Sequence, residues 1–273
     1  MAVLTSVGTS LALNVARGAY ELVGALRLQD TWAYCGWQDI RSRYRRSILG
    51  PWWLTASTAV TIGVLGLLWS QIFQLDIKEY LPFYAIGYVV WTWFAAQIND
   101  ACFGFTQFEH IIKQTRLPYP TYLLRLAIRN TLILAHHAVV VVVVLVLCGV
   151  GWHMVSWLSV VGLALITIVS VLLSILVAIC CARYRDLPPL VASLLQVMFF
   201  LTPILWQPGA LRSYAWIVDV NPLYHWIEVI RRPLLGHWPD AASYGWTGAS
   251  IVLLGLAALW LLGRQRDRIA YWM

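Results

Sequence analysis

The sequence VSWLSVVGLALITIVSVLLSILVAICC, residues 155–181, contains no charged side chain over 27 positions. A helix must be roughly 20 residues long to cross a hydrocarbon core of about 30 Å, so this run predicts a transmembrane helix. The whole chain has the same character, because 60% of its 273 residues are hydrophobic and only 11% are charged. An ordinary soluble domain has about a quarter charged residues. Most soluble folds are therefore excluded.

Six apolar runs are candidates for crossing a membrane. They are residues 52–73, 81–101, 128–148, 155–181, 190–206 and 246–262. The last two lie at the short end of the required range. Pro203 is expected to kink or end the fifth run, because proline cannot donate the helical hydrogen bond. The prediction is an all-α integral membrane protein with six transmembrane helices within residues 51–273.

The basic residues lie mostly on one side of these six runs. If both termini are inside, the inner segments carry 15 of the 19 Lys and Arg residues, and the outer segments carry Lys78, Arg212, Arg231 and Arg232. Cytoplasmic loops are enriched in Lys and Arg, so this asymmetry predicts cytoplasmic N- and C-termini. Residues 1–29 show no basic start and no cleavage site, and we expect this segment to stay in the cytoplasm.

An arginine-rich stretch, DIRSRYRRSILGPWW at residues 39–53, precedes the first run. From Asp30, a typical N-cap residue, apolar side chains recur at helical spacing, at Ala33, Trp37, Ile40, Tyr44 and Ile48. This pattern predicts an amphipathic interface helix over residues 30–50 that lies on the membrane, with its arginines towards anionic headgroups. A plain topology anchor is the alternative. Nucleic-acid binding is disfavoured, because nothing interleaves with the arginines for base readout.

Two further connections are expected to contain short helices. Residues 105–120 include EHIIKQTRLPYP, which predicts a helix from Glu109 to Arg116, a break at Pro118 and Pro120, and a restart at Thr121. Such a helix, held between two long spans, can transmit force; a solvated loop is the alternative. Residues 207–245 include LRSYAWIVDV and PLYHWIEVIRRPLL, which predict two helices that each rise about 15 Å, half a bilayer. They are expected to dip into or lie on the outer leaflet, with their ends sheltered by protein.

Catalytic chemistry is poorly represented in the sequence. Neither lysine follows a glycine, so the Walker phosphate-binding motif is absent and any ATP must be hydrolysed by another polypeptide. The five cysteines lack C-x-x-C spacing, which disfavours a zinc site. The adjacent His136 and His137 point about 100° apart on a helix and cannot hold one metal from one face. A proton relay and a neutral histidine bonded to a neighbouring helix stay open. Arg125 and Arg129, at the inner end of the third run, are expected to snorkel.

Aromatic side chains are concentrated in the first two runs, and Tyr88, Trp91 and Phe94 follow three-residue steps. Aromatic faces can stack on the C–H faces of sugar rings, so a glycan could slide past them. The residues assigned to such a conduit are Trp69, Tyr84, Tyr88, Trp91 and Phe94. Interface belts and packing are the alternative.

The order of RSRYRRSILGPWW, EHIIKQTRLPYPTYLLR with the following IRN, ARYRDLPPLV, FFLTPILW and NPLYHWIEVIRRPLLG resembles the permease subunit of ABC transporters that export polysaccharides. The resemblance spans about residues 30–273, and IKQTRLP and IRN are most similar to O-antigen (lipopolysaccharide) exporters. It implies a homodimer in the bacterial inner membrane with two copies of a separate ATPase subunit, which binds ATP and Mg. No cofactor is implied in this chain. The implied substrate is a lipid-linked polysaccharide, moved from cytoplasm to periplasm through a channel formed by both copies.

The resemblance also implies roles for particular residues. The short inner helix would couple to the ATPase through Glu109, His110, Lys113, Gln114 and Arg116. The two outer helices would form a periplasmic gate that includes Tyr224, Trp226, Glu228, Arg231 and Arg232. Guanidinium groups suit phosphate, so the lipid pyrophosphate would be guided at the inner surface by Arg41, Arg43, Arg45 and Arg46.

Two other functions stay open. An ABC permease for a drug or another lipid would share the topology, but it needs neither ring-rich spans nor an arginine-rich helix. An integral-membrane glycosyl- or acyltransferase predicts paired catalytic carboxylates, or a His/Asp pair, at one membrane face. The sequence offers no such pair, so the chain is expected to be a transport subunit rather than an enzyme.

Overall fold

The computed structural model describes residues 2–45, 50, 52–210 and 215–273, and every regular element in these ranges is helical. The α-helices are α1 (Ala2–Arg27), α2 (Gln29–Arg43), α3 (Trp52–Ile72), α4 (Ile77–Cys102), α5 (Glu109–Gln114), α6 (Pro120–Leu147), α7 (Leu158–Arg183), α8 (Leu187–Leu201), α9 (Ala215–Val220), α10 (Pro222–Leu234) and α11 (Ala241–Trp272). Short 3-10 turns are η1 (Thr106–Phe108), η2 (Met154–Trp157) and η3 (Pro208–Ala210). The expected all-α architecture is confirmed for the described part of the chain.

Within the described ranges, five helices are long and apolar enough to cross a membrane: α3, α4, α6, α7 together with η2, and α11. The expected fifth run is shorter. Helix α8 has 15 residues, a rise of about 22 Å, and ends where Thr202 adopts an extended conformation. A residue that precedes proline is disfavoured in the helical region, so Pro203 sets this end. Six full-length spans are thus corrected to five long helices and one shorter apolar helix.

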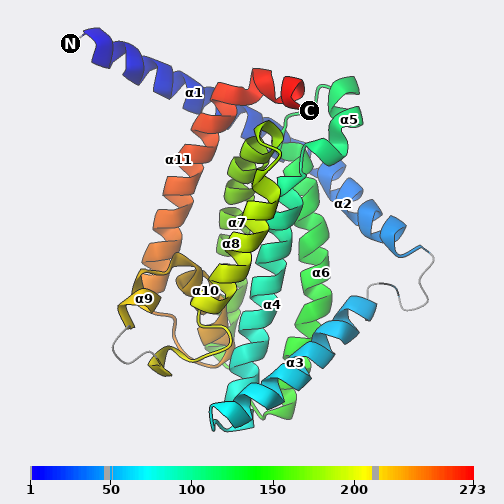
Figure 1. The fold of residues 1–273 in the computed structure, drawn as a ribbon, viewed down its shortest axis with the longest axis vertical. Helices are drawn as coiled ribbons and strands as arrows, with labels where there is room; N and C mark the ends of the chain where they lie inside the picture. Colours follow the sequence, from blue (N-terminus) through cyan, green and yellow to red (C-terminus); the bar gives the residue numbers. More distant parts are fainter. Residues whose placement is uncertain (1, 46–49, 51, 211–214) are drawn as a thin grey trace.

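Both ends of the described chain lie at the same end of the bundle. Figure 1 shows α1, α2, α5 and the C-terminus at one end, and α9, α10 and the α3–α4 connection at the other. Helix α8 follows α7 and leads towards α9, so it runs along the bundle from the first of these ends towards the second. The chain therefore passes along the bundle an even number of times, although α8 is short.

Local chemistry sets where several helices begin. The Asp76 carboxylate caps α4 by accepting a hydrogen bond of 2.9 Å from the Lys78 backbone N–H. Asn221 caps α10 in the same way, accepting from the Leu223 N–H at 3.0 Å, as the Asn-Pro sequence predicts. Helix α6 begins at Pro120, one residue before the expected restart, because proline is well suited to a first helical turn.

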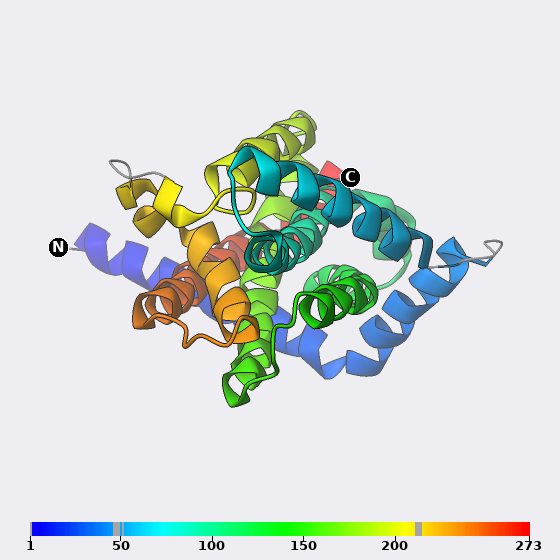
Figure 2. The same ribbon diagram turned by 90° about the horizontal axis from the view of Figure 1, so that it is seen from below.

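Residues 1–29 contain a long helix that the sequence analysis did not predict. Helix α1 crosses α11 at two glycines: a Cβ on Gly18 would lie 1.9 Å from the Leu259 carbonyl oxygen, and one on Gly263 would lie 1.8 Å from that of Asn14. Glu21 pairs with Arg266 at 3.0 Å beside this crossing. Figure 2 shows α1 passing across the end of the bundle. The two glycines therefore permit direct backbone contact between α1 and α11.

The helix expected over residues 30–50 is observed as α2, with different ends, and its position at the membrane interface stays a prediction. It begins at Gln29 and ends at Arg43, so Asp30 lies in the first turn and not at the N-cap. Residues 46–49 and 51, which include the predicted Arg46 and Ile48, lie outside the described residues. The helical prediction is thus correct for its first part, and its ends are revised.

The face by which α2 packs on α6 differs from the predicted stripe. Ile40 of the predicted stripe is buried within the chain, whereas Trp37 of the same stripe is 55% exposed. Gly36 supplies the closest approach, since a Cβ there would lie 2.8 Å from the Arg125 carbonyl oxygen. A pattern of apolar side chains cannot identify a contact made by a glycine.

A polar cluster joins α4, α6 and α7 inside the bundle. Asn130 donates to Gln97 at 2.9 Å and to Asp100 at 2.9 Å, and Gln97 donates to the Ser174 hydroxyl at 3.1 Å. Arg129 pairs with Asp100 at 2.5 Å, so it does not simply snorkel. Polar groups at membrane depth cost several kcal/mol unless they are paired. The cluster therefore fixes how these three helices meet.

Candidate functional site

The aromatic row, defined as Tyr84, Tyr88, Trp91 and Phe94, follows one helix, α4. The rings of Tyr84 and Tyr88 lie 5.5 Å apart, and those of Trp91 and Phe94 lie 6.1 Å apart. Tyr84, Trp91 and Phe94 are buried within this single chain, and Tyr88 is half-buried. The structure thus brings the predicted conduit residues together, with Tyr88 alone among the four partly accessible.

The row continues onto α8 through Phe199, which the sequence analysis did not select. The Phe199 ring lies 6.4 Å from that of Tyr88 and 5.9 Å from that of Trp91. The signal was present in FFLTPILW, where two adjacent phenylalanines lie within the fifth apolar run. Trp69 lies instead on α3, where it is half-buried and stacks on Phe73 at 5.3 Å. Three helices therefore contribute the rings.

Helices α3 and α8 each leave a set of apolar side chains uncovered. No residue of α8 is buried. Both helices pack on α4, and they lie on the same side of it in Figure 2. We call this side the α3–α8 face; its exposed side chains include Val60, Val64, Leu67, Leu68, Leu190, Leu194, Val197 and Phe200. The Phe200 ring of this face lies 5.3 Å from that of Phe199, which in turn contacts Tyr88.

The predicted gate residues lie on α10, and three of them form one charged cluster. Arg231, which is 1% exposed, donates through Nε to Glu228 at 2.7 Å and through Nη1 to the Pro203 carbonyl oxygen at 2.7 Å. Its guanidinium also lies 3.8 Å from the centre of the Phe83 ring. Arg232 contacts Glu228 at 3.5 Å and pairs with Asp240. The cluster ties α10 to α4 and to the end of α8.

Of the other two predicted gate residues, Trp226 connects α10 to two neighbouring helices. Trp226 donates from its indole nitrogen to the Ser250 hydroxyl at 3.1 Å, and its ring lies 5.6 Å from Phe94. Helix α10 therefore touches the aromatic row directly. Burial raises the pKa of Tyr224 to about 12, so its phenol stays protonated. Burial opposes the charge of Arg232, but the hydrogen bond and attraction of Asp240 outweigh it and raise the pKa of the guanidinium.

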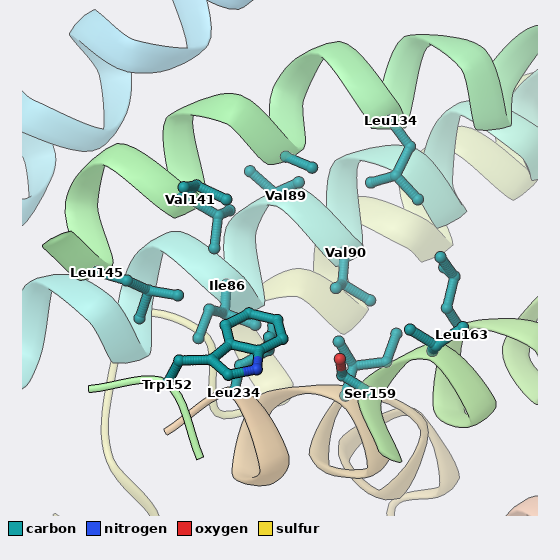
Figure 3. Close-up of a pocket in the computed structure, with 14 residues that line it drawn as sticks. Ile86, Val89, Val90, Leu134, Val141, Leu145, Trp152, Ser159, Leu163 and Leu234 are labelled. Atoms are coloured by element: carbon teal, nitrogen blue, oxygen red, sulfur yellow. The ribbon is translucent and has the colours of Figure 1, made fainter. Parts of the chain in front are cut away.

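An apolar cavity of about 220 Å³ lies between α4, α6, α7 and α10. Figure 3 shows Ile86, Val89, Val141 and Leu145 around it, with Trp152 at one side. Ser159 also lines the cavity, but its hydroxyl already donates to the Ser156 carbonyl oxygen at 2.6 Å. The lining therefore suits hydrocarbon rather than sugar.

The predicted coupling residues lie at the same end of the bundle as the C-terminus (Figure 1). Helix α5 ends at Gln114 and Thr115 is extended, so Arg116 lies beyond the helix, which corrects the predicted end. His110, Lys113, Gln114 and Arg116 are exposed. Lys113 pairs with Glu109 at 2.5 Å and lowers the pKa of that carboxyl, first by the hydrogen bond and then by its charge. The segment thus presents a charged surface with a net positive balance.

The arginine row, defined as Arg41, Arg43, Arg45 and Arg46, is described for its first three members, and all three are exposed. Arg41 and Arg45 line a cavity of about 390 Å³ together with Trp37 and Tyr44. This combination of guanidinium groups and aromatic rings beside a hollow can receive an anionic headgroup.

The adjacent histidines bind neighbouring groups rather than each other. His137 Nε2 lies 3.5 Å from the Thr58 hydroxyl and links α6 to α3. His136 Nδ1 donates to the Leu132 carbonyl oxygen at 2.7 Å, and its ring lies 5.5 Å from that of Trp52. Across residues 2–45, 50, 52–210 and 215–273, no group of three His, Cys, Asp or Glu side chains is arranged to hold a metal ion.

Comparison with known proteins identifies the family. The model of the ABC-2 type transporter family matches residues 31–235, from α2 to the end of α10. Two proteins of Klebsiella pneumoniae, each named O-antigen export system permease protein RfbA, are 27% and 26% identical over 229 residues, covering 81% of this chain and 87% of each relative. A Myxococcus xanthus protein of the same name is 25% identical over 243 residues, covering 85% and 91%. Together with its apolar helices, this match shows that the chain belongs to the ABC-2 type transporter family and is a membrane-embedded permease.

Proposed function

We propose that this permease works as a homodimer with two copies of a separate ABC ATPase subunit, in the inner membrane of a bacterium. The complex exports a lipid-linked polysaccharide of the O-antigen type from the cytoplasm to the periplasm. The observation that carries the proposal is the similarity to the O-antigen export permeases over more than four-fifths of the chain. ATP and Mg are bound by the partner, which supplies the energy.

The α3–α8 face supports a second copy. Two chains that meet through this face enclose a channel between them, with Tyr88 and Phe199 of each copy towards it. Trp69, Tyr84, Trp91 and Phe94 lie behind these two rings and become lining residues if the helices separate during transport. Helix α8, with residues 202–206, completes the sixth crossing in this arrangement.

The two ends of the channel have different chemistry. At the inner end, the arginine row guides the lipid pyrophosphate, because a guanidinium can form two parallel hydrogen bonds with a phosphate. At the outer end, α9 and α10 act as re-entrant gate helices. The contact between Trp226 and Phe94 links the gate to the aromatic row. Both termini are cytoplasmic, so α5 faces the ATPase.

The decisive experiment is to purify the permease from its native membrane and to identify what accompanies it. The proposal expects a Walker-motif ATPase at equal stoichiometry and a co-purified polyprenyl-linked glycan by mass spectrometry. It also expects loss of surface polysaccharide when the gene is deleted. A permease for a drug or another lipid would leave surface polysaccharide intact. Glycan-modifying activity without nucleotide would support the enzyme alternative and reject the proposal.

A further inference from the structure

Arg125 lies where the interface helix, the coupling segment and a long apolar helix meet. We infer that Arg125 is a positioning residue that makes α2, with its arginine row, follow the movements of the coupling helix α5. This inference rests on the proposed function, in which α5 receives movement from an ATPase. The Arg125 clasp is defined here as Arg125 together with Asp39 and Phe108.

On one side, the clasp holds α2. Arg125 donates to the Asp39 carboxylate through Nε at 2.7 Å and through Nη2 at 2.6 Å, a two-pronged bond. The two side chains are 20% and 22% exposed, so the pair is largely shielded. Such charge-assisted, bidentate pairs fix orientation as well as distance. The close approach of Gly36 to the Arg125 backbone leaves α2 little freedom to slide on α6.

On the other side, the clasp holds the coupling segment. The Arg125 guanidinium lies 4.5 Å from the centre of the Phe108 ring, in η1 directly before α5. Phe108 is buried and stacks on Tyr122 at 5.6 Å. The Tyr122 hydroxyl lies 3.5 Å from the hydroxyl of Thr115, the residue that follows α5. Both ends of α5 are therefore connected to the first turns of α6.

Only arginine can bind the Asp39 carboxylate and stack on the Phe108 ring at the same time. Its planar guanidinium binds a carboxylate with its edge while its face lies on an aromatic ring. A lysine at this position can pair with Asp39 but lacks the flat face for Phe108. The ATPase would push on α5, and the clasp would turn that push into a displacement of the arginine row at the membrane surface.

Arg129 provides a matched control one turn further along α6. It also pairs with an aspartate, Asp100, but the partner lies on α4 and not on α2. Arg129→Lys therefore changes the same chemistry on the same helix and leaves the clasp intact.

The experiment measures spin-label distances in the full complex with its ATPase, reconstituted in nanodiscs with and without trapped ATP. One label pair, at the exposed Gln38 and Gln107, spans the clasp from α2 to η1. A second pair, at Gln107 and the exposed Ser193 of α8, reports whether the coupling segment moves. In the wild type, we expect ATP to shift the second distance and to leave the first unchanged. Arg129→Lys is expected to behave in the same way.

In Arg125→Lys and in Phe108→Leu, we expect the Gln38–Gln107 distance to shift and broaden with ATP, while the ATPase still co-purifies. ATP hydrolysis should continue while export is lost. A Gln38–Gln107 distance that stays fixed in both variants would overturn the inference and leave the proposed function standing. If the Gln107–Ser193 distance in the wild-type complex does not change when ATP binds, the result would contradict the proposed function itself, and the inference with it.

Discussion

The Arg231 guanidinium donates a hydrogen bond of 2.7 Å to the backbone carbonyl oxygen of Pro203. This bond joins α10 to the position where α8 stops being helical. The carbonyl lies just after the point at which proline interrupts the helical ladder, so it is free to accept from a side chain. A buried arginine thus compensates for the early end of α8.

Replacement of Arg231 by Met is expected to destabilise the permease by about 3–5 kcal/mol, because it leaves the buried Glu228 without its main partner. Thermal unfolding of the purified protein measures this loss. Arg232→Met is the control: Arg232 is 34% exposed, pairs with the 60% exposed Asp240 and reaches Glu228 only at 3.5 Å, so its removal should cost about 0–1 kcal/mol. Equal losses in the two variants would contradict the assigned role of the Arg231 contacts.

Gly263→Ala is expected to separate α1 from α11, because the added Cβ cannot fit 1.8 Å from the Asn14 carbonyl oxygen. Limited trypsin digestion should then cut faster at Arg17 and Arg27. Gly245→Ala in the same helix is the control, since nothing lies within 4 Å of the new methyl group. That change should stabilise the helix by about 0.5–1 kcal/mol. If trypsin cuts both variants at the wild-type rate, the glycine crossing is not what holds α1.

Tyr88→Ala is expected to lower export by about two- to tenfold, the equivalent of one aromatic contact of about 0.5–1.5 kcal/mol. The amount of polysaccharide at the cell surface, at equal permease levels in the membrane, measures the effect. Trp238→Ala removes a 73% exposed ring outside the row and should leave export unchanged. Normal export in both Tyr88→Ala and Trp91→Ala would rule out the lining role.

Replacement of Arg43 and Arg46 together by Gln is expected to reduce export about fivefold or more per residue, from about 1 kcal/mol of attraction to anionic headgroups for each. The double Lys variant separates two interpretations. A plain topology anchor needs only positive charge, so lysines would restore full export. Phosphate guidance uses the two-pronged guanidinium, so lysines should restore export only in part. Unchanged surface polysaccharide in the Gln variant would reject guidance.

Much of the structure at the two ends of the bundle could be predicted from local sequence. Asn221-Pro222 predicts the start of α10, Pro118 and Pro120 predict the break before α6, and Pro203 predicts the early end of α8. Each is a property of a few consecutive residues. The roles assigned to the conduit, gate and arginine residues stay predictions, because they depend on a second copy, a motor and a substrate.

By itself, the sequence determined that the chain is a helical membrane protein, since long apolar runs and the placement of Lys and Arg follow from the cost of moving each side chain into lipid. Tertiary structure alone decided which helices touch. The Arg125–Asp39 pair joins positions 86 residues apart, and the Gly18–Leu259 approach joins the two ends of the chain. Neither contact can be predicted from neighbouring residues in the sequence. An ion pair between distant residues can be identified only when the positions of both partners are known, and a glycine contributes no apolar side chain to a helical pattern.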